Sequence, residues 1–105
     1  MIILDLGCGI KKIKNSIGVD RSLNSKANII CDMSYGLPFK NNTIDVIYIL
    51  NVLEHFENTI MLMNEIWRIS KPTSKITIRV PHFSSLYAWV DPDHKKAFSY
   101  TSFDS

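Results

Sequence analysis

Two glycines that end an apolar run near the start of the chain are the first residues that could serve a chemical purpose. Residues 2–6 are apolar apart from Asp5, and Gly7 and Gly9 follow them. A run of this length that stops at glycines is typical of a strand buried in a parallel sheet. Glycines there permit unusual backbone angles and leave no side chain between the main chain and a ligand. Because ligands of open α/β sheets lie beyond the carboxyl ends of the strands, this loop is predicted to bind one.

Acidic residues follow the next two apolar segments. Asp20 ends the predicted strand at residues 17–20, and Asp32 follows the predicted strand at residues 28–31. Both carboxylates should therefore lie at the ligand-facing edge of the sheet, where Asp20 would suit the hydroxyls of a ribose. The alternative is that each acid caps a turn. We favour ligand roles because both acids occupy the predicted binding edge.

The spacing after the glycines separates two classes of cofactor. Dinucleotide-binding loops follow the pattern G-x-G-x-x-G/A, whose third small residue allows close packing of a helix on a strand. Counted from Gly7, that position holds Lys12. A long side chain cannot provide the close packing, so the dinucleotide hypothesis is weakened.

Residues 4–9, Leu-Asp-Leu-Gly-Cys-Gly, resemble motif I of the class I S-adenosylmethionine-dependent methyltransferases, in particular the type 11-like family. The resemblance continues in order along about four fifths of the chain, at residues 17–20, 31–33, 37–39, 44–47, 52–55, 65–72 and 76–78. Each segment alone is a weak signal, but several in the family's order and spacing are a strong one.

The resemblance implies a Rossmann-like α/β fold, a three-layer sandwich around a mostly parallel sheet with strand order 3-2-1-4-5. The family's last two strands would be missing. It also implies S-adenosylmethionine as cofactor and S-adenosylhomocysteine as product. Asp20 would bind the ribose and Asp32 the exocyclic amine of adenine. The predicted cofactor-binding residues are Asp5, Gly7, Cys8, Gly9, Asp20, Arg21, Asp32, Met33 and Asn51.

Candidate catalytic residues are fewer, because methyl transfer depends mainly on alignment of the reactants and needs a base only where the nucleophile starts protonated. Asn51 directly follows the predicted strand at residues 44–50, where it could orient a substrate or cap a turn. His55 could contact cofactor or substrate, or make a structural hydrogen bond. His82 and His94 are candidate bases.

Residues 81–105 differ from the rest of the chain because they are rich in aromatic residues, serine and histidine. They show no clear helix or strand period, so they are predicted to form a loop or lid on the substrate side. Asp91, Asp93 and the histidines lack the tight spacing of a metal site, and no metal is predicted.

The connecting elements are predicted from period and length. The links after residue 9 and after residue 20 are too short for a long helix, since a parallel crossover normally takes a dozen residues or more. Residues 60–69 have the apolar spacing of an amphipathic helix, with Asn58 or Thr59 as cap. A turn at residues 72–74 and a strand at residues 75–80 should follow.

Composition limits the remaining possibilities. The 105 residues fit one domain spanning 1–105, and the formal charge of +2 indicates no particular partner. Two cysteines suggest no disulfide framework, and no run has the length of a membrane span, so a cytoplasmic protein is predicted. A basic cluster is interpreted as a solvated face, with a phosphate-bearing substrate as the alternative; its members are Lys11, Lys12, Lys14, Arg21 and Lys26.

Two functional hypotheses remain at this point. The first is a methyltransferase acting on an unidentified acceptor, with a small molecule favoured and nucleic acid not indicated. The second is a cofactor-binding module without activity of its own. The missing strands motivate the second hypothesis, because they would leave strand five as an exposed edge that a homodimer could cover.

Overall fold

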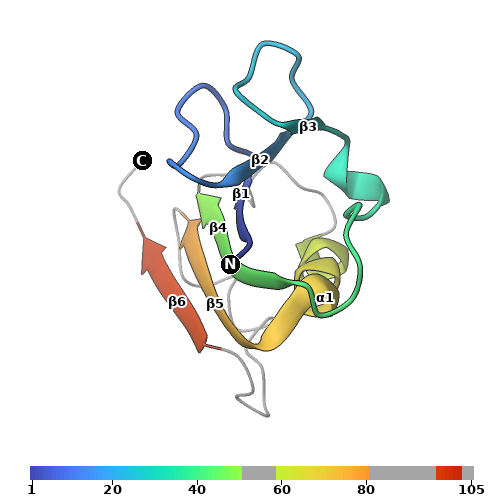
Figure 1. Cartoon of the computed structure of the whole chain (residues 1–105), viewed down its shortest axis with the longest axis vertical. Coiled ribbons are helices and arrows are strands. Elements are labelled where there is room, and N and C mark those ends of the chain that lie inside the picture. The colour runs from blue at the N-terminus through green and yellow to red at the C-terminus, as the bar shows by residue number, and fades with distance from the viewer. Residues whose placement is uncertain (51–58, 81–96, 103–105) are drawn as a thin grey trace.

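The computed structural model describes residues 1–50, 59–80 and 97–102. Within these residues, six parallel strands form one sheet in the order β3-β2-β1-β4-β5-β6 (Figure 1). The elements in chain order are β1 (Ile3–Leu6), β2 (Ile17–Asp20), β3 (Ile29–Ile30), the short 3-10 helix η1 (Met33–Tyr35), β4 (Ile44–Leu50), α1 (Thr59–Ile69), β5 (Ser70–Val80) and β6 (Ala97–Ser102). The predicted order 3-2-1-4-5 and the Rossmann-like α/β class are confirmed.

One face of the sheet forms the hydrophobic core together with α1. Along β4, the fully buried Ile47 and Ile49 alternate with half-buried residues, and their parallel register sets them beside Leu4 and Leu6 of β1. Helix α1 contributes to the same core residues that recur on one side of the helix, Leu62, Ile66 and Ile69. This alternation on β4 and helical spacing on α1 bury both apolar surfaces against each other.

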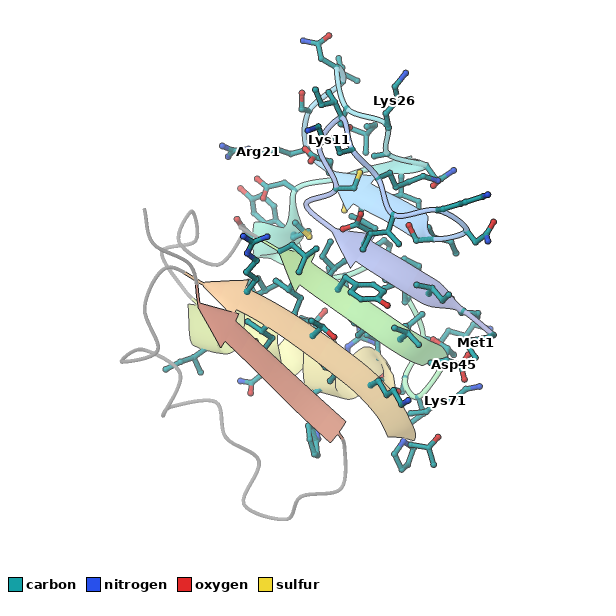
Figure 2. All side chains as sticks on the ribbon, turned by 90° about the vertical axis from the view of Figure 1, so that its left-hand side faces the viewer. Met1, Lys11, Arg21, Lys26, Asp45 and Lys71 are labelled. Carbon is teal, nitrogen blue, oxygen red and sulfur yellow. The ribbon has the colours of Figure 1, made fainter. Side chains whose placement is uncertain are left out.

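The opposite face of the sheet is less covered. Val46 and Tyr48 of β4 and Thr77 of β5 are half-buried there, while Lys75 and Arg79 are exposed. Figure 2 views the sheet from this side, and α1 lies behind it. Within residues 1–50, 59–80 and 97–102, α1 is the one α-helix. The described part of the chain therefore supplies a helical layer on one face.

The links on both sides of β2 are loops, as their lengths predicted. Residues 7–16 and 21–28 contain turns and bends but no helix. Side chains of these loops cover part of the sheet that a helix would otherwise cover. The stem of Lys12 lies over Gly18 of β2, where an added Cβ atom would come within 2.7 Å of the Lys12 Cδ atom.

Strand β6 corrects two predictions, that residues 81–105 form a loop or lid and that the chain supplies no strand after the fifth. Ala97–Ser102 pairs in parallel with β5, from Lys75 opposite Ala97 to Val80 opposite Ser102. The fifth strand is therefore an interior strand, and the exposed edge on which the homodimer was premised is occupied by the chain itself. The remainder of the predicted lid, residues 81–96 and 103–105, lies outside the described residues.

The predicted turn at residues 72–74 is also wrong, because β5 begins at Ser70, directly after α1. The ladder with β4 is irregular there: Ser70 pairs with Ile44, and the next pair joins Lys75 to Val46. Pro72 has no N–H for a ladder, and this irregular stretch accommodates it. Helix α1 begins at Thr59, and the alternative cap Asn58 lies outside the described residues.

Candidate functional site

The glycine loop after β1 adopts the backbone conformation that its glycines allow. Gly7 has φ 69° and Gly9 has φ 58°, both in the left-handed region. The main-chain N–H groups of Gly7 and Cys8 donate to the Val19 carbonyl of β2, at 2.6 and 3.3 Å. Apart from its chain neighbours, no atom of the described residues would lie within 4 Å of a Cβ atom at Gly9. The loop is thus held against β2, while the described residues leave the space beside Gly9 open.

Asp20 connects the end of β2 to this loop. Its Oδ2 atom accepts a hydrogen bond from Gly9 N at 2.9 Å, and its Oδ1 atom accepts from Ser22 N at 2.9 Å. The second contact is the turn cap that the sequence left open as an alternative. Because a carboxylate has about four acceptor positions, these two bonds leave capacity for a ligand. The half-buried carboxylate therefore lies next to the open space at Gly9.

Asp5 fixes the inside of the loop. Its side chain is buried, and Oδ2 accepts from Ile13 N at 2.9 Å. Burial raises the pKa of the Asp5 carboxyl, although the hydrogen bond from Ile13 and the charge of Lys12 act in the opposite direction. These contacts give Asp5 the role of holding the loop, and its contact with the cofactor stays a prediction.

Lys12 has a structural role that sequence reasoning missed. Its Nζ atom donates to the Ser16 carbonyl and to Asn28 Oδ1, both at 2.9 Å. The same Asn28 oxygen accepts from Gly18 N at 2.9 Å. Lys12 therefore ties the β1–β2 loop to the β2–β3 loop, and this lysine does not belong to a freely solvated face. A lysine followed four residues later by a serine gave no sequence signal for this contact.

Other basic residues do project from the loops around the site. Lys11, Arg21 and Lys26 lie beyond one end of the strands, away from Met1, Asp45 and Lys71 at the other end (Figure 2). Lys11, Lys14, Arg21 and Lys26 are exposed. For these four residues the interpretation as a solvated basic face is consistent with the structure.

Asp32 begins η1 beyond the end of β3. It is exposed, and its Oδ1 atom accepts from Ser34 N at 2.9 Å. The hydrogen bonds from Ser34, with a smaller contribution from the positive charge of Arg21, lower the pKa of Asp32. The Met33 side chain is buried in the core, so only its main chain is available to a ligand. An ionised acceptor thus lies at the outer edge of the candidate site.

The cysteines behave as packing residues. Cys8 is buried and Cys31 is half-buried against the core, and both are free. Burial raises the pKa of both thiols, and neighbouring acids add to the effect: Asp5 and Asp20 at Cys8, Asp32 at Cys31. The thiols are therefore neutral at pH 7, as expected for small apolar fillers.

The structure brings one part of the predicted site together and does not describe the other. Asp5, the glycine loop, Asp20 and Asp32 gather at the carboxyl ends of β1, β2 and β3. The catalytic candidates Asn51, His55, His82 and His94 lie outside the described residues, as do Asp91 and Asp93. Within the described ranges, no group of three or more His, Cys, Asp or Glu could hold a metal ion.

The described helices include none that is long and apolar enough to cross a membrane.

Comparison with known proteins gives the chain its family. A family of methyltransferase domains matches residues 4–78, from β1 into β5. The chain is also 39% identical over 97 residues to uncharacterized protein MJ0638 of Methanocaldococcus jannaschii, a match covering 81% of this chain and 43% of that relative. The chain thus spans less than half the length of that relative. No solved structure matches the chain significantly. The glycine loop and the acids that surround it lie within the matched residues, and the chain belongs to the class I S-adenosylmethionine-dependent family of methyltransferase domains.

Proposed function

We propose that this chain binds S-adenosylmethionine at the carboxyl ends of β1, β2 and β3 and transfers its methyl group to a small-molecule acceptor. The observation that carries the proposal is the open space beside Gly9, next to the Asp20 carboxylate. Lys12 further disfavours a dinucleotide, because its side chain fills the position where that class of loop needs a small residue.

The described residues offer the open space and the hydrogen-bond acceptors that the proposed cofactor would use. The open side of the glycine loop would admit the methionine end. Asp20 would accept hydrogen bonds from the ribose hydroxyls with its unused lone pairs, and Asp32 would accept from the adenine amine, with the Met33 main chain beside it. Cys8, Arg21 and Asn51 complete the proposed contacts. When bound, S-adenosylmethionine supplies an activated methyl group.

The protein's part in such a reaction is to bind, align and exclude water. Asp5 and Asp20 hold the loop in one conformation before any ligand arrives, so little ordering is needed on binding. Asn51 and His55 are proposed to contact the reacting groups, and His82 or His94 would take a proton from an acceptor that starts protonated. The free cysteines support a reducing, cytoplasmic location.

The test is calorimetric titration of the purified chain with S-adenosylmethionine and S-adenosylhomocysteine, with NAD as the control ligand. Binding of the first two without binding of NAD is the expected result. A folded chain that binds none of the three, or binds NAD in preference, would refute the proposed site.

A second candidate function is a cofactor-binding module that needs a partner chain for activity. The sheet face opposite α1, where Lys75 and Arg79 are exposed, favours this candidate because a partner could cover it. Formation of S-adenosylhomocysteine by the isolated chain, followed chromatographically with a panel of small nucleophiles, distinguishes the two. Tight binding without turnover of any of them would favour the module.

A further inference from the structure

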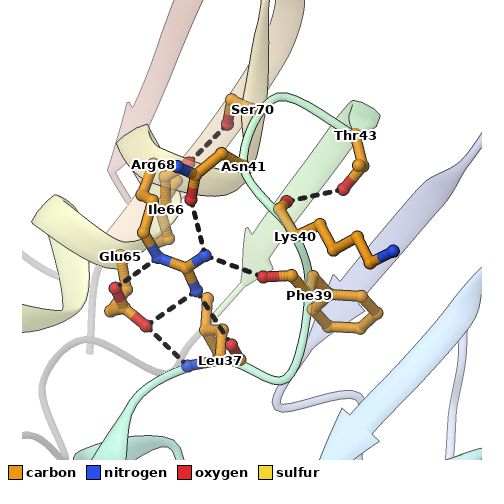
Figure 3. A network of polar contacts seen from close by, with 9 residues as sticks. All are labelled: Leu37, Phe39, Lys40, Asn41, Thr43, Glu65, Ile66, Arg68 and Ser70. Atoms are coloured by element: carbon orange, nitrogen blue, oxygen red, sulfur yellow. Dashed lines mark hydrogen bonds and ion pairs between the residues drawn. The ribbon is translucent and has the colours of Figure 1, made fainter.

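The segment that leads from η1 to β4 is fastened to α1 by two charged side chains (Figure 3). Arg68 donates through Nε to Glu65 Oε2 at 2.7 Å and through Nη2 to Glu65 Oε1 at 3.0 Å. The same guanidinium donates to the Leu37 carbonyl at 2.9 Å and the Phe39 carbonyl at 2.8 Å. It also donates to Asn41 Oδ1 at 2.9 Å. One arginine therefore reaches three positions of a segment that is about thirty residues away in sequence.

Glu65 also binds this segment, and we call Arg68 and Glu65 together the clamp. Its Oε1 atom accepts from Leu37 N at 2.8 Å, so both main-chain polar groups of Leu37 are bound by the pair. The hydrogen bonds from Arg68 and then from Leu37 lower the pKa of Glu65. Bonds between a planar guanidinium and a carboxylate are charge-assisted and fix orientation as well as distance. A lysine cannot reproduce this fork of donors.

Gly36 shows how closely Glu65 approaches the segment. Gly36 has φ 108°, and a Cβ atom at this position would lie 2.9 Å from Glu65 Oε1. Met33 and Leu37, on either side, are buried in the core. The segment is thus held both by the packing of Met33 and Leu37 in the core and by the Glu65 carboxylate.

The clamp sits four residues from the start of η1. Asp32 caps that short helix through Ser34, and Gly36 N donates to the Met33 carbonyl at 3.2 Å before the chain reaches Leu37. The position of Asp32 is therefore set at one end by β3 and at the other by the Leu37 contacts. Because the three-residue 3-10 helix η1 lies between Asp32 and Leu37, the distance between these two residues can vary little.

We propose that Arg68 and Glu65 are positioning residues for the adenine end of the cofactor and set its selectivity for the exocyclic amine. The inference rests on the proposed function, in which Asp32 accepts from that amine. The pair touches no ligand itself and acts by holding η1, and with it the Asp32 carboxylate, at a fixed distance from the glycine loop.

The experiment compares two probes, S-adenosylhomocysteine and S-inosylhomocysteine, in which a carbonyl replaces the amine. A hydrogen bond to a charged acceptor corresponds to a selectivity of roughly 10- to 100-fold for the wild-type chain. In Arg68→Lys and in Glu65→Gln the ratio of the two dissociation constants should fall roughly tenfold, mainly through weaker binding of S-adenosylhomocysteine. Circular dichroism and thermal unfolding confirm that each variant is folded.

Two further variants make the comparison specific. Lys40→Met removes a positive charge from the same segment, and in Figure 3 the Lys40 amine points away from Glu65 and Arg68. This control should keep the wild-type ratio. Asp32→Asn should itself abolish most of the selectivity, so that adding Arg68→Lys to it lowers the ratio no further.

The outcomes separate this inference from the proposed function. Wild-type binding of S-adenosylhomocysteine with an unchanged ratio in both Arg68→Lys and Glu65→Gln would overturn the positioning role alone. Equal loss of affinity for both probes in these variants would also overturn it, because the pair would then support the fold without setting selectivity. A wild-type chain that binds neither probe would overturn the proposed function and this inference together.

Discussion

Replacement of Gly9 by alanine tests the conformation of the loop and its role in binding at the same time. Gly9 has φ 58°, and a left-handed backbone costs an L-residue about 1–2 kcal/mol. Apart from the chain neighbours, the new Cβ atom would meet no atom of residues 1–50, 59–80 and 97–102 within 4 Å, so these residues add no steric cost to this figure. We therefore expect Gly9→Ala to lower the free energy of unfolding by about 1–2 kcal/mol, measured by urea denaturation.

Gly9→Ala should also weaken cofactor binding, and the loss of stability does not account for this because the variant stays folded. The methyl group would occupy the open space that the cofactor is proposed to enter. We expect the affinity for S-adenosylhomocysteine to fall by roughly tenfold or more, equivalent to about 1.4 kcal/mol, in calorimetric titrations of the folded variant.

Asn42 offers a control matched in backbone conformation. It has φ 57°, precedes β4 at the amino end of the strand, and lies away from the glycine loop. Asn42→Ala should destabilise the chain by a comparable or smaller amount and leave the affinity unchanged. Wild-type affinity in Gly9→Ala would refute the placement of the cofactor, and unchanged stability would refute the loop conformation.

Three further predictions follow from described contacts. Asp20→Ala should weaken S-adenosylhomocysteine binding by about 1–3 kcal/mol in calorimetry, since the ribose and Gly9 N both lose an acceptor; unchanged affinity would remove Asp20 from the site. Ile66→Ala should lower the free energy of unfolding by about 2–5 kcal/mol in urea, because Ile66 is fully buried; a loss below about 1 kcal/mol would contradict the packing of α1. The folded-state pKa of Glu65 lies below its ordinary value of 4.5, so its stabilisation is present above that pH and is lost as pH falls through the folded value. The stability gap between wild type and Glu65→Gln should therefore narrow on acidification, and a gap independent of pH would contradict the ion pair.

The central strands could be predicted from the sequence because their signal is local. The strands predicted at residues 17–20 and 44–50 have the bounds of β2 and β4. Short apolar runs that end at a polar residue or a glycine predict such strands whatever their partners are, although the structure leaves alternate residues of β4 only half-buried. The short links around β2 were predictable for a similar reason, since their lengths alone exclude a long helix.

Strand β6 was missed because its signal is weak without its partner. Residues 98–101, Phe-Ser-Tyr-Thr, alternate aromatic and hydroxyl side chains, which is the period of a strand. Four alternating residues are too few to predict a strand in a segment that otherwise shows no clear period. The missing information was the ladder with β5, which no local pattern contains.

For the site, too, the local features could be predicted and the contacts between distant residues could not. Glycines and acids at strand ends marked its location, because topology determines where strand ends meet. The bond from Gly9 N to Asp20 and the reach of Arg68 to Leu37 depend on contacts distant in sequence. From sequence alone, Glu65 and Arg68 are an ordinary pair three residues apart on a helix surface.

The strand order has a consequence for how the chain folds. Strand β1 pairs with β2 across a short loop, whereas its other neighbour, β4, is distant: Ile2 N donates to Asp45 Oδ2, 43 residues along the chain. In chain order, the sheet extends from β1 through β2 to β3, and β4 then pairs with the other side of β1. Pairing β4 with β1 closes a longer loop than pairing β2 with β1, so it costs more loop-closure entropy and slows folding. The proposed ligand lies where the strand order reverses, at β1. A ligand that binds only the closed sheet would lower the population of open states by mass action, so protection of β1 and β4 amides from hydrogen exchange should rise with cofactor concentration.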